Sequence, residues 1–416
     1  MNQMKRLMSQ FFKERIFCGL DIGSQKIKAC LSRVHDAENL ELLAVNEADT
    51  RGLLDRSVND IAEFSSVIGS VCEGLTKKTK VRFHDLYLGI GGDLVETRMS
   101  RAVIPLTERG NKVIVPSDVR AARHQARLLG VRLDEEVICD LVRQFKVDDV
   151  NIANNPVGLY GRKIEVETLL VVVNVTRLRN ITKAIRQAGY EVNHIFYNGE
   201  VLAEAALDKR HRVDGSVLVD FGAKKTAILV FKEGLLKHFS FAFFGGDTMT
   251  RRIAEKMTIP FDLAEDVKKT YVRLSEKPAL AEGDEVLIKK DQGFVPVRRS
   301  VITGIIDEDV NQFIEHIRDA IAASGYEGQI KSGIVMAGGG SLLTGLMERV
   351  ETSIGLPVTM ARNIPGLNNS SLYSMATSLA EAGYKGSLRY IFDTRKPKDW
   401  FDALKARATE FCNEYF

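Results

Sequence analysis

Residues Asp21 to Lys26 combine the residue types that bind a phosphate chain. An apolar run ends at Asp21, Gly23 and Ser24 turn the chain, and polar and apolar residues then alternate from Lys26 to Leu31. This pattern predicts a strand, a tight turn and a second strand. The N–H groups of such a turn form an anion site, Asp21 could hold Mg²⁺ through water, and Lys26 could reach a phosphate oxygen. For this stretch alone, a plain hairpin closed by its aspartate remains the alternative.

A second stretch, SVLVDFGAKKTAILVF, repeats this pattern from Ser216 onward. Its Asp220 and Gly222 match the aspartate and the glycine of the first stretch, and Lys225 matches the lysine. A strand, a D-x-G turn and a strand that recur in one chain indicate two halves of similar topology. Two such hairpins that face each other could clasp a phosphate chain from both sides.

Two further glycine clusters mark candidate binding positions. Gly245, Gly246 and Asp247 precede a helical pattern, and a helix N-terminus is a place for phosphate oxygens. Residues 338–340 are three glycines between a strand and a helix, where a base or ribose could lie on the backbone. A tight strand-to-helix turn is the alternative, but a third glycine-marked strand end in one chain favours a ligand.

The elements that position these motifs follow an α/β order. The first strands, a helix over residues 60–77 and the strand DLYLGI indicate a mixed sheet with covering helices. Residues from about 94 to 167 look like a small α+β module inserted into the first domain, with Ser117 as the N-cap of its helix. Arg120, Arg123 and Arg127 form either a basic stripe or, more simply, a solvated helix face. We expect His194 to be a packed core side chain.

The composition bounds the class of protein. The chain has 416 residues, enough for roughly two to four domains. Its 45% hydrophobic and 27% charged residues are typical of a soluble globular protein, and a net charge of +3 argues against a dedicated nucleic-acid binder. The five cysteines show no C-x-x-C pair, which favours a reduced cytosol and argues against zinc. No apolar run reaches the roughly 18 residues that span a bilayer.

Both ends of the chain carry amphipathic patterns. Near the start, the apolar residues Met4, Leu7, Met8, Phe11 and Phe12 share a helical face that we expect to dock on the body, with membrane contact as the alternative. At the other end, a polar linker precedes a helix with basic flanks, which is typical of an interfacial membrane helix. A helix docked on the body is the alternative there. The residues expected at the membrane are Trp400, Phe401, Leu404, Phe411 and Tyr415.

These motifs stand in a known order. Residues 21–26 resemble the first phosphate loop of the actin/Hsp70/sugar-kinase superfamily, residues 220–222 its second, and residues 338–340 its adenosine motif. The stretches DLYLGIGGDLVETR, FKVD, NPVGLYG, GGDTMTRRIA and AEDVKKTY closely resemble the FtsA family of bacterial cell division proteins. The resemblance covers nearly the whole chain from about Phe17 onward, and the amphipathic C-terminal helix is part of it.

The resemblance implies an α/β fold: an actin-like, two-lobed fold with duplicated RNase H-like domains plus an inserted small α+β subdomain. The implied ranges are an N-terminal extension 1–15, a first lobe 16–84 and 169–197, the inserted subdomain 85–168, a second lobe 198–246 and 328–385, its small subdomain 247–327, a linker 386–398 and a membrane-targeting helix 399–416.

The resemblance also implies ATP and Mg²⁺ between the lobes, with Asp21 and Asp220 at the metal and Asp220 as the catalytic residue. The implied cofactor-binding residues are Asp21, Gly23, Ser24, Gln25 and Lys26 of the first loop, Gly222, Ala223, Lys224, Lys225 and Thr226 of the second, Gly245, Gly246 and Asp247, Glu265 and Lys268 of a nucleoside-contacting helix, and Gly338, Gly339 and Gly340. At most weak ATPase activity is expected, because Asn198 and Gly199 stand where strongly hydrolysing relatives have Glu-Pro, and asparagine cannot act as a general base. Lys224 and Ala227 also depart from the usual second loop.

Four partners follow from the resemblance: the FtsZ C-terminal peptide, further copies of the chain in an actin-like filament, later division proteins at the inserted subdomain, and the cytoplasmic face of the cell membrane at the division site. No nucleic-acid partner is expected. A small-molecule kinase of the same superfamily and a pilus assembly adaptor of the PilM kind are the alternatives. Against the kinase, this sequence has no evident substrate Asp motif. Against the adaptor, a protein of that kind is not expected to end in a membrane helix.

Overall fold

The computed structural model describes residues 15–34, 40–54, 57–107, 110–152, 155–274, 285–290, 293–361 and 370–392. The amphipathic face at Met4 to Phe12 and the C-terminal helix 399–416 lie outside the described residues. The start of the expected linker is helical, because the last described helix continues to Phe392.

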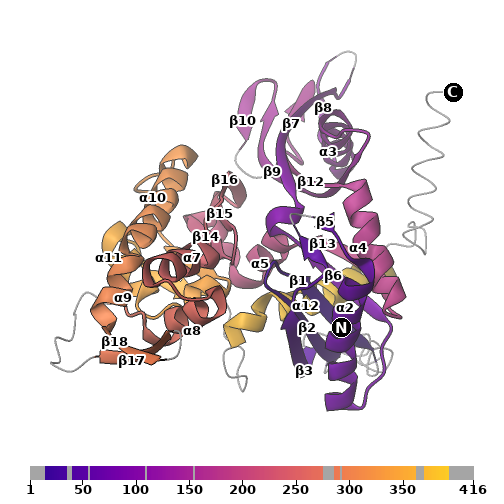
Figure 1. Cartoon of the computed structure of the whole chain (residues 1–416). Coiled ribbons are helices and arrows are strands. Elements are labelled where there is room, and N and C mark those ends of the chain that lie inside the picture. The colour runs from indigo at the N-terminus through magenta and orange to yellow at the C-terminus, as the bar shows by residue number, and fades with distance from the viewer. Residues whose placement is uncertain are drawn as a thin grey trace.

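Two five-stranded sheets with the same strand order form the two lobes (Figure 1). The first sheet has the order β13-β6-β1-β2-β3, with β13 Glu191–Tyr197, β6 Asp85–Ile90, β1 Ile16–Ile22, β2 Lys26–Val34 and β3 Leu40–Asp49. The second has β20-β19-β14-β15-β16, with β20 Val358–Met360, β19 Ile334–Ala337, β14 Ser216–Phe221, β15 Thr226–Lys232 and β16 Leu235–Ala242. The central strands β1 and β14 pair antiparallel with β2 and β15, which follow them in the sequence. On their other side they pair parallel with β6 and β19. The duplication predicted from the two D-x-G hairpins is therefore confirmed.

Helices cover both faces of the first sheet. α2 (Ile61–Thr79) is capped by Asp60, whose carboxylate accepts from the N–H of Glu63 at 2.9 Å, and it buries a face that includes Phe64 and Leu75. α4 (Val175–Gln187) lies beside it and ends at Ala188. On the opposite face, α12 (Ser374–Phe392) packs against β1 and β2.

The two lobes exchange helices. α12 follows the second lobe in the sequence, yet its Ala376 and Ala380 pack with Phe17 of the first sheet. α5 (Asn198–Ala206) follows the first lobe, yet Leu202 packs with Leu218 of the second sheet. Each sheet is therefore packed by a helix that follows the other lobe in the sequence, and these two helices connect the lobes.

The other face of the second sheet carries a smaller helical subdomain. α10 (Asp307–Ser324) lies on β15 and β16, and its Phe313 ring stacks on Phe221 with centroids 4.4 Å apart. The remaining elements here are α7 Gly246–Met257, α8 Phe261–Tyr271, the hairpin β17 Glu285–Lys290 with β18 Gly293–Arg298, α9 Arg299–Ile305, the 3-10 turn η2 Gly339–Leu342 and α11 Leu346–Ile354. α6 Lys209–Asp214 contacts β15, and the 3-10 turn η3 Ser370–Tyr373 contacts β2 and α12.

A four-stranded antiparallel sheet and one helix form the insert at the top of the first lobe (Figure 1). The strand order is β10-β9-β12-β7, with β10 Val150–Ile152, β9 Glu135–Val147, β12 Lys163–Asn174 and β7 Glu96–Pro105. The helix is α3 Pro116–Gly130, and β8 Lys112–Val113 pairs with β11 Tyr160–Gly161. Because β6 belongs to the first sheet, the insert begins after β6, at the 3-10 turn η1 (Gly92–Leu94). The short strands β4 Leu53–Leu54 and β5 Ser57–Val58 form a separate ribbon.

Three local predictions were wrong. Ser117 is not the N-cap of α3: Pro116 is the first helical residue, and the Asp118 carboxylate accepts from the N–H of Val115 at 2.9 Å. Two of the three arginines of α3 are ion-paired instead of solvated, because Arg123 and Arg127 contact Asp140 on β9 at 2.7 and 3.0 Å. The side chain of His194 is exposed, because it lies on the outward face of the edge strand β13 beside Phe196.

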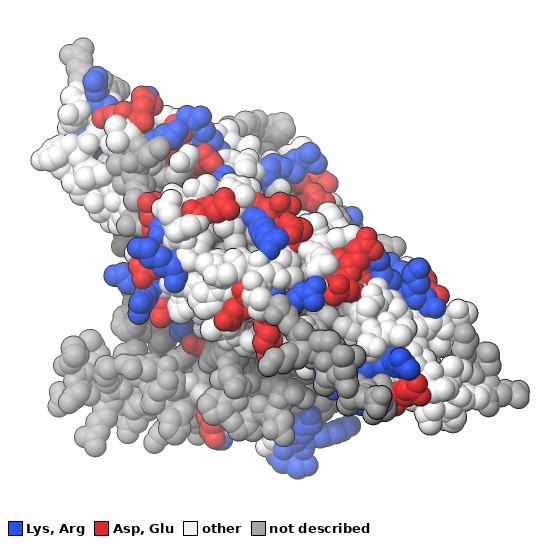
Figure 2. Space-filling model, turned by 90° about the vertical axis from the view of Figure 1, so that its left-hand side faces the viewer, with Lys and Arg blue, Asp and Glu red and all other residues white. Residues whose placement is uncertain are grey.

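Within the described part of the chain, no helix is long and apolar enough to cross a membrane. The face of the second lobe seen in Figure 2 carries acidic and basic side chains interspersed with each other.

The contact of α12 with the first sheet sets the stability of the joint. A Cβ atom on Gly383 would lie 2.5 Å from the ring of Tyr87, so we expect Gly383→Ala to lower the free energy of unfolding by about 1–3 kcal/mol. On the same helix, a Cβ atom on Gly386 meets nothing within 4 Å. Gly386→Ala should therefore raise stability by about 0.5–1 kcal/mol through helix propensity. Urea unfolding of both variants checks this, and an equal effect of the two would contradict the packing.

Candidate functional site

The two D-x-G hairpins have the same geometry. The N–H of Gly23 donates to the carbonyl of Lys26 at 3.1 Å, and the N–H of Gly222 donates to the carbonyl of Lys225 at the same distance. The first turn is also held from β3, because the Thr50 N–H donates to the carbonyl of Gln25 at 2.7 Å and its hydroxyl to that of Gly23 at 2.8 Å. Each turn is therefore fixed at the end of the central strand of its lobe.

The two strand-end aspartates interact across the joint between the lobes. Burial and then the charge of Asp21, opposed by Lys28, raise the pKa of Asp220 to about 6. Burial also raises the pKa of Asp21, against the opposing effects of Lys28 and of the hydrogen bond from Asn198. Two carboxylates in one water-poor space repel each other, so a cation near them would stabilise both charges.

Asn198, at the start of α5, completes this group. Its side-chain amide donates to Asp21 Oδ1 at 2.9 Å, while its Oδ1 is buried and makes no hydrogen bond to the described residues. Two carboxylates and an amide oxygen are the ligand types that Mg²⁺ prefers, so the residues fit this ion. Because the described residues hold no group of three or more His, Cys, Asp or Glu side chains that could bind a metal, most of its ligands would be water and phosphate oxygen.

The lysines of the two turns contact protein groups. The Lys26 ammonium pairs with Glu47 on β3, and that of Lys28 donates to the carbonyl of Leu372 at 2.9 Å. The Lys225 ammonium donates to the carbonyl of Gly92 at 3.1 Å, and Lys224 is exposed in the same turn. Ser24 and Ala223 lie in their turns, half-buried. Thr226 is fully buried, with its hydroxyl donating to the carbonyl of Phe244 at 2.8 Å, so its role here is in packing.

The N-terminus of α7 braces the second turn. The N–H groups of Gly246 and Asp247 donate to the carbonyls of Gly222 and Ala223 at 3.0 and 2.8 Å, and Gly245 lies against the same turn. The Gln25 side chain of the first turn bonds to the Asp247 carboxylate. These predicted phosphate contacts thus lie together and join the two lobes.

Glu265 and Lys268 form a buried pair behind this turn. The Lys268 ammonium contacts Glu265 at 2.7 Å, the Thr250 hydroxyl at 2.7 Å and the carbonyl of Gly246 at 2.8 Å. Burial lowers the pKa of Lys268, although the charge of Glu265 opposes this. Burial would raise the pKa of Glu265, but Lys268 and the hydrogen bonds hold it below its usual value.

The three glycines after β19 differ in what surrounds them. Gly338 has φ +83°, and a Cβ atom there would lie 2.4 Å from the carbonyl of Phe221 and 2.8 Å from Asp220 Oδ1. A Cβ on Gly340 would overlap the Phe221 ring, whereas one on Gly339 meets only Leu372, at 3.9 Å. Gly338 and Gly340 are therefore required by packing against β14, and Gly339 alone has room for a side chain.

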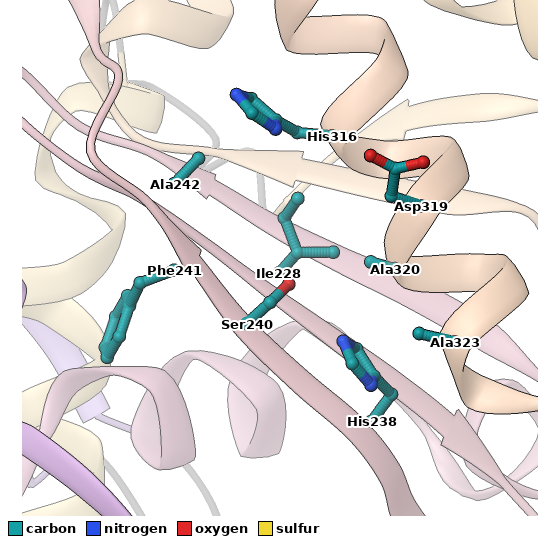
Figure 3. Close-up of a pocket in the computed structure, with 9 residues that line it drawn as sticks. All are labelled: Ile228, His238, Ser240, Phe241, Ala242, His316, Asp319, Ala320 and Ala323. Carbon is teal, nitrogen blue, oxygen red and sulfur yellow. The ribbon is translucent and has the colours of Figure 1, made fainter.

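A pocket of about 180 Å³ lies elsewhere, between β15, β16 and α10 (Figure 3). The residues that line it are Ile228, His238, Ser240, Phe241, Ala242, His316, Asp319, Ala320 and Ala323. None of these is a predicted site residue, so this pocket is distinct from the group at the two turns.

Three contacts at the turns were not predicted: those of Lys28, Thr50 and Gly92. The hairpin register could have revealed Lys28, because it pairs directly with Asp21. Nothing local marks Thr50 or Gly92, because their partners lie on other elements.

Two models of known protein families match this chain. Residues 92–172 match the model of the SHS2 domain inserted in FtsA, and residues 217–380 match that of cell division protein FtsA. The chain belongs to the FtsA family. FtsA of Pseudomonas aeruginosa is 26% identical over 377 residues, covering 89% of each chain. FtsA of Streptococcus pneumoniae is 25% identical, covering 89% of this chain and 80% of the relative, and FtsA of Escherichia coli K12 is 23% identical, covering 90% and 91%.

Solved structures agree on the actin-like fold of the FtsA family. The PilM-PilN type IV pilus biogenesis complex matches with a TM-score of 0.64 at 16% identity, covering 88% of this chain and 98% of that chain. MreB 5 of Spiroplasma citri bound to AMPPNP matches with a TM-score of 0.54 at 12% identity, covering 91% and 98%. This protein is therefore a cell division protein of the actin-like ATPase superfamily.

The raised pKa of Asp220 has a consequence for stability. The carboxyl is protonated in both the folded and the unfolded chain below about pH 4, so folding then does not bury a charge. Between about pH 4 and pH 6 only the unfolded chain ionises, and stability falls as the pH rises. We expect Asp220→Asn to raise the free energy of unfolding by about 3 kcal/mol at pH 7.5, in EDTA and without nucleotide, and by little at pH 4.

Urea unfolding from pH 4 to pH 8 checks this prediction. Asp266→Asn, at an exposed position of α8, is the matched control against which the effect of Asp220→Asn is compared at each pH. A pH-independent effect of Asp220→Asn would contradict the burial of this charge.

Proposed function

We propose that this chain is an ATP-binding actin homologue that polymerises on the cytoplasmic membrane and tethers FtsZ filaments to it during cell division. The observation that carries the nucleotide part is the pair of equivalent hairpins, whose Asp21 and Asp220 face one water-poor space at the joint of the lobes. Membership of the FtsA family supports the division and membrane parts.

In this proposal Asp21, Asp220 and the Asn198 amide oxygen hold Mg²⁺ largely through water. The ion would neutralise the phosphate charge between the lobes. The turn residues 23–26 and 222–226 and the α7 start at residues 245–247 surround the phosphates, and residues 338–340 carry the adenosine, with Glu265 and Lys268 behind. The AMPPNP bound to the MreB 5 structure supports a nucleotide in this fold.

Hydrolysis is slow in this proposal. Asn198 donates a hydrogen bond to Asp21 and cannot take a proton from water. Loss of a general base costs a factor of about 10²–10⁴ in rate. Asp220, with a pKa near 6, is the group at the site that could accept a proton at neutral pH.

The domain ranges from the sequence are part of the proposal, except that the inserted subdomain begins at Gly92 after β6 and not at residue 85. The inserted subdomain contacts the next protomer and later division proteins, and the FtsZ C-terminal peptide is a further partner. Membrane attachment rests on the helix 399–416, since the charges on the viewed face of the second lobe are mixed (Figure 2). Location at the division site, peripheral on the cytoplasmic face, follows from these contacts.

A PilM-like pilus adaptor is the second candidate, because the PilM-PilN complex has the higher TM-score of the two structures compared above. At 16% identity this likeness concerns the fold alone, whereas both family models are those of FtsA. A small-molecule kinase of the same superfamily remains the third candidate and has no observation of its own here.

Gly339→Asp tests the nucleotide site. The position has room for a side chain, so the fold should be retained, while the new carboxylate would meet ribose or phosphate. We expect ATP affinity by calorimetry to fall about 100-fold or more. Gly304→Asp on α9, where a Cβ meets nothing within 4 Å, should bind ATP normally. Unchanged affinity in Gly339→Asp would remove the adenosine assignment.

Trp400→Glu, or removal of residues 399–416, tests the tether. We expect either change to release the protein from anionic vesicles and to leave ATP binding intact, because the apolar face drives insertion and each basic flank adds about 1 kcal/mol. FtsZ filaments should co-sediment with vesicles only when the full chain is present. Salt should weaken the wild-type binding. If the shortened chain pellets with vesicles as well as the full chain, the apolar face of residues 4–12 becomes the candidate anchor.

A further inference from the structure

The inserted subdomain is a sequence insertion in the first lobe, yet it is also fixed to the second lobe. β9 of the insert lies against β16, the edge strand of the second sheet. The Arg143 guanidinium on β9 donates to the carbonyl of Lys237 at 3.0 Å and pairs with Glu167 on β12 at 3.1 Å. One arginine thus joins the two sheets.

A second contact ties the root of the insert to the second phosphate turn. The Lys225 ammonium donates to the carbonyl of Gly92 at 3.1 Å. Gly92 begins η1, the turn that links β6 of the first lobe to β7 of the insert. Lys225 is only 8% exposed, and its ammonium lies 3.3 Å from the centroid of the Phe241 ring, so both the carbonyl and the ring contact a largely desolvated charge.

A third contact links the insert to the helix that begins at the paired carboxylates. Cys139 on β9 lies near Glu200 on α5, and burial first, then the charge of Glu200, raise the pKa of its thiol. Glu200 follows two residues after the Asn198 that bonds to Asp21. The insert therefore contacts the surroundings of both hairpin turns, and only Lys225 belongs to a turn itself.

The Lys225 contact is the one that phosphate can displace. A phosphate oxygen carries charge, and a hydrogen bond between two charged groups is roughly twice as strong as one to a neutral carbonyl. Lysine has a flexible four-carbon stem, so the ammonium can leave Gly92 without movement of its backbone. Its own carbonyl already closes the turn through the N–H of Gly222.

We propose that Lys225 is a phosphate-sensitive switch that couples the second hairpin turn to the root of the inserted subdomain. This rests on the proposed nucleotide site. When phosphate draws the ammonium away, Gly92 loses its partner in the second lobe, while Arg143, the contact of β9 with β16 and the packing of Leu169 still hold the insert there. The surface that the insert presents to other proteins then depends on the nucleotide.

Hydrogen exchange of a peptide spanning residues 88–99 tests this switch. The full chain is used at a concentration where sedimentation shows monomers, with AMPPNP and Mg²⁺, with adenosine, or without either. We expect AMPPNP to raise exchange in this peptide about tenfold, and adenosine, which lacks phosphate, to leave it unchanged.

Lys225→Met keeps most of the side-chain volume and removes the charge. It should show the raised exchange without any ligand and no further rise with AMPPNP. Lys209→Met, at an exposed position of α6 outside both turns, is the control and should keep the response to AMPPNP. If the peptide spanning residues 88–99 exchanges in Lys225→Met as it does in the wild type without ligand, Lys225 does not restrain this segment and the proposal is wrong.

Calorimetry in parallel separates the two proposals. If AMPPNP binds and the wild-type peptide does not respond, the switch is wrong and the nucleotide site stands. If AMPPNP does not bind, the nucleotide site and the switch are both wrong.

Discussion

The fold brings two carboxylates with the same strand position into one desolvated space. Asp21 and Asp220 end the central strands of two sheets that share one strand order, and each charge raises the cost of the other. The surrounding contacts maintain this arrangement: Asn198 bonds to Asp21, Lys28 opposes both rises in pKa, and Gly338 lets β19 approach β14. A cation bound beside the two carboxylates would offset their mutual repulsion, and the same cation could bind a phosphate chain. In this way the arrangement supports the proposed function.

The exchange of helices explains how this space stays formed. α5 packs on the second sheet and α12 on the first, so neither lobe completes its core alone. α5 also starts at Asn198, so one helix both packs the second lobe and contacts the first carboxylate. Any motion of one lobe relative to the other must therefore change contacts of the residues that surround the site. It must also change the contacts of the insert with the second lobe at Arg143 and Lys225.

Family membership and local geometry carry different parts of the conclusion. The two family models identify a cell division protein of the actin-like superfamily. The contacts of this chain add what a family name does not contain: an asparagine amide bonded to Asp21, a lysine in the second turn bound to the insert, and, of the three glycines after β19, only Gly339 with room for a side chain.

The sequence by itself determined the local elements, because strand alternation, helix periodicity and turn glycines act over a few residues. The two hairpins and α2 were predicted close to their observed bounds. The duplication was also readable, since each half repeats its own D-x-G turn. Only the tertiary structure decided that α12 crosses to the first lobe, that Arg123 and Arg127 pair with Asp140, and that Lys225 bonds to Gly92. Each of these contacts joins separate elements, and the pattern of one element carries no information about which distant charge or carbonyl packing will bring to it.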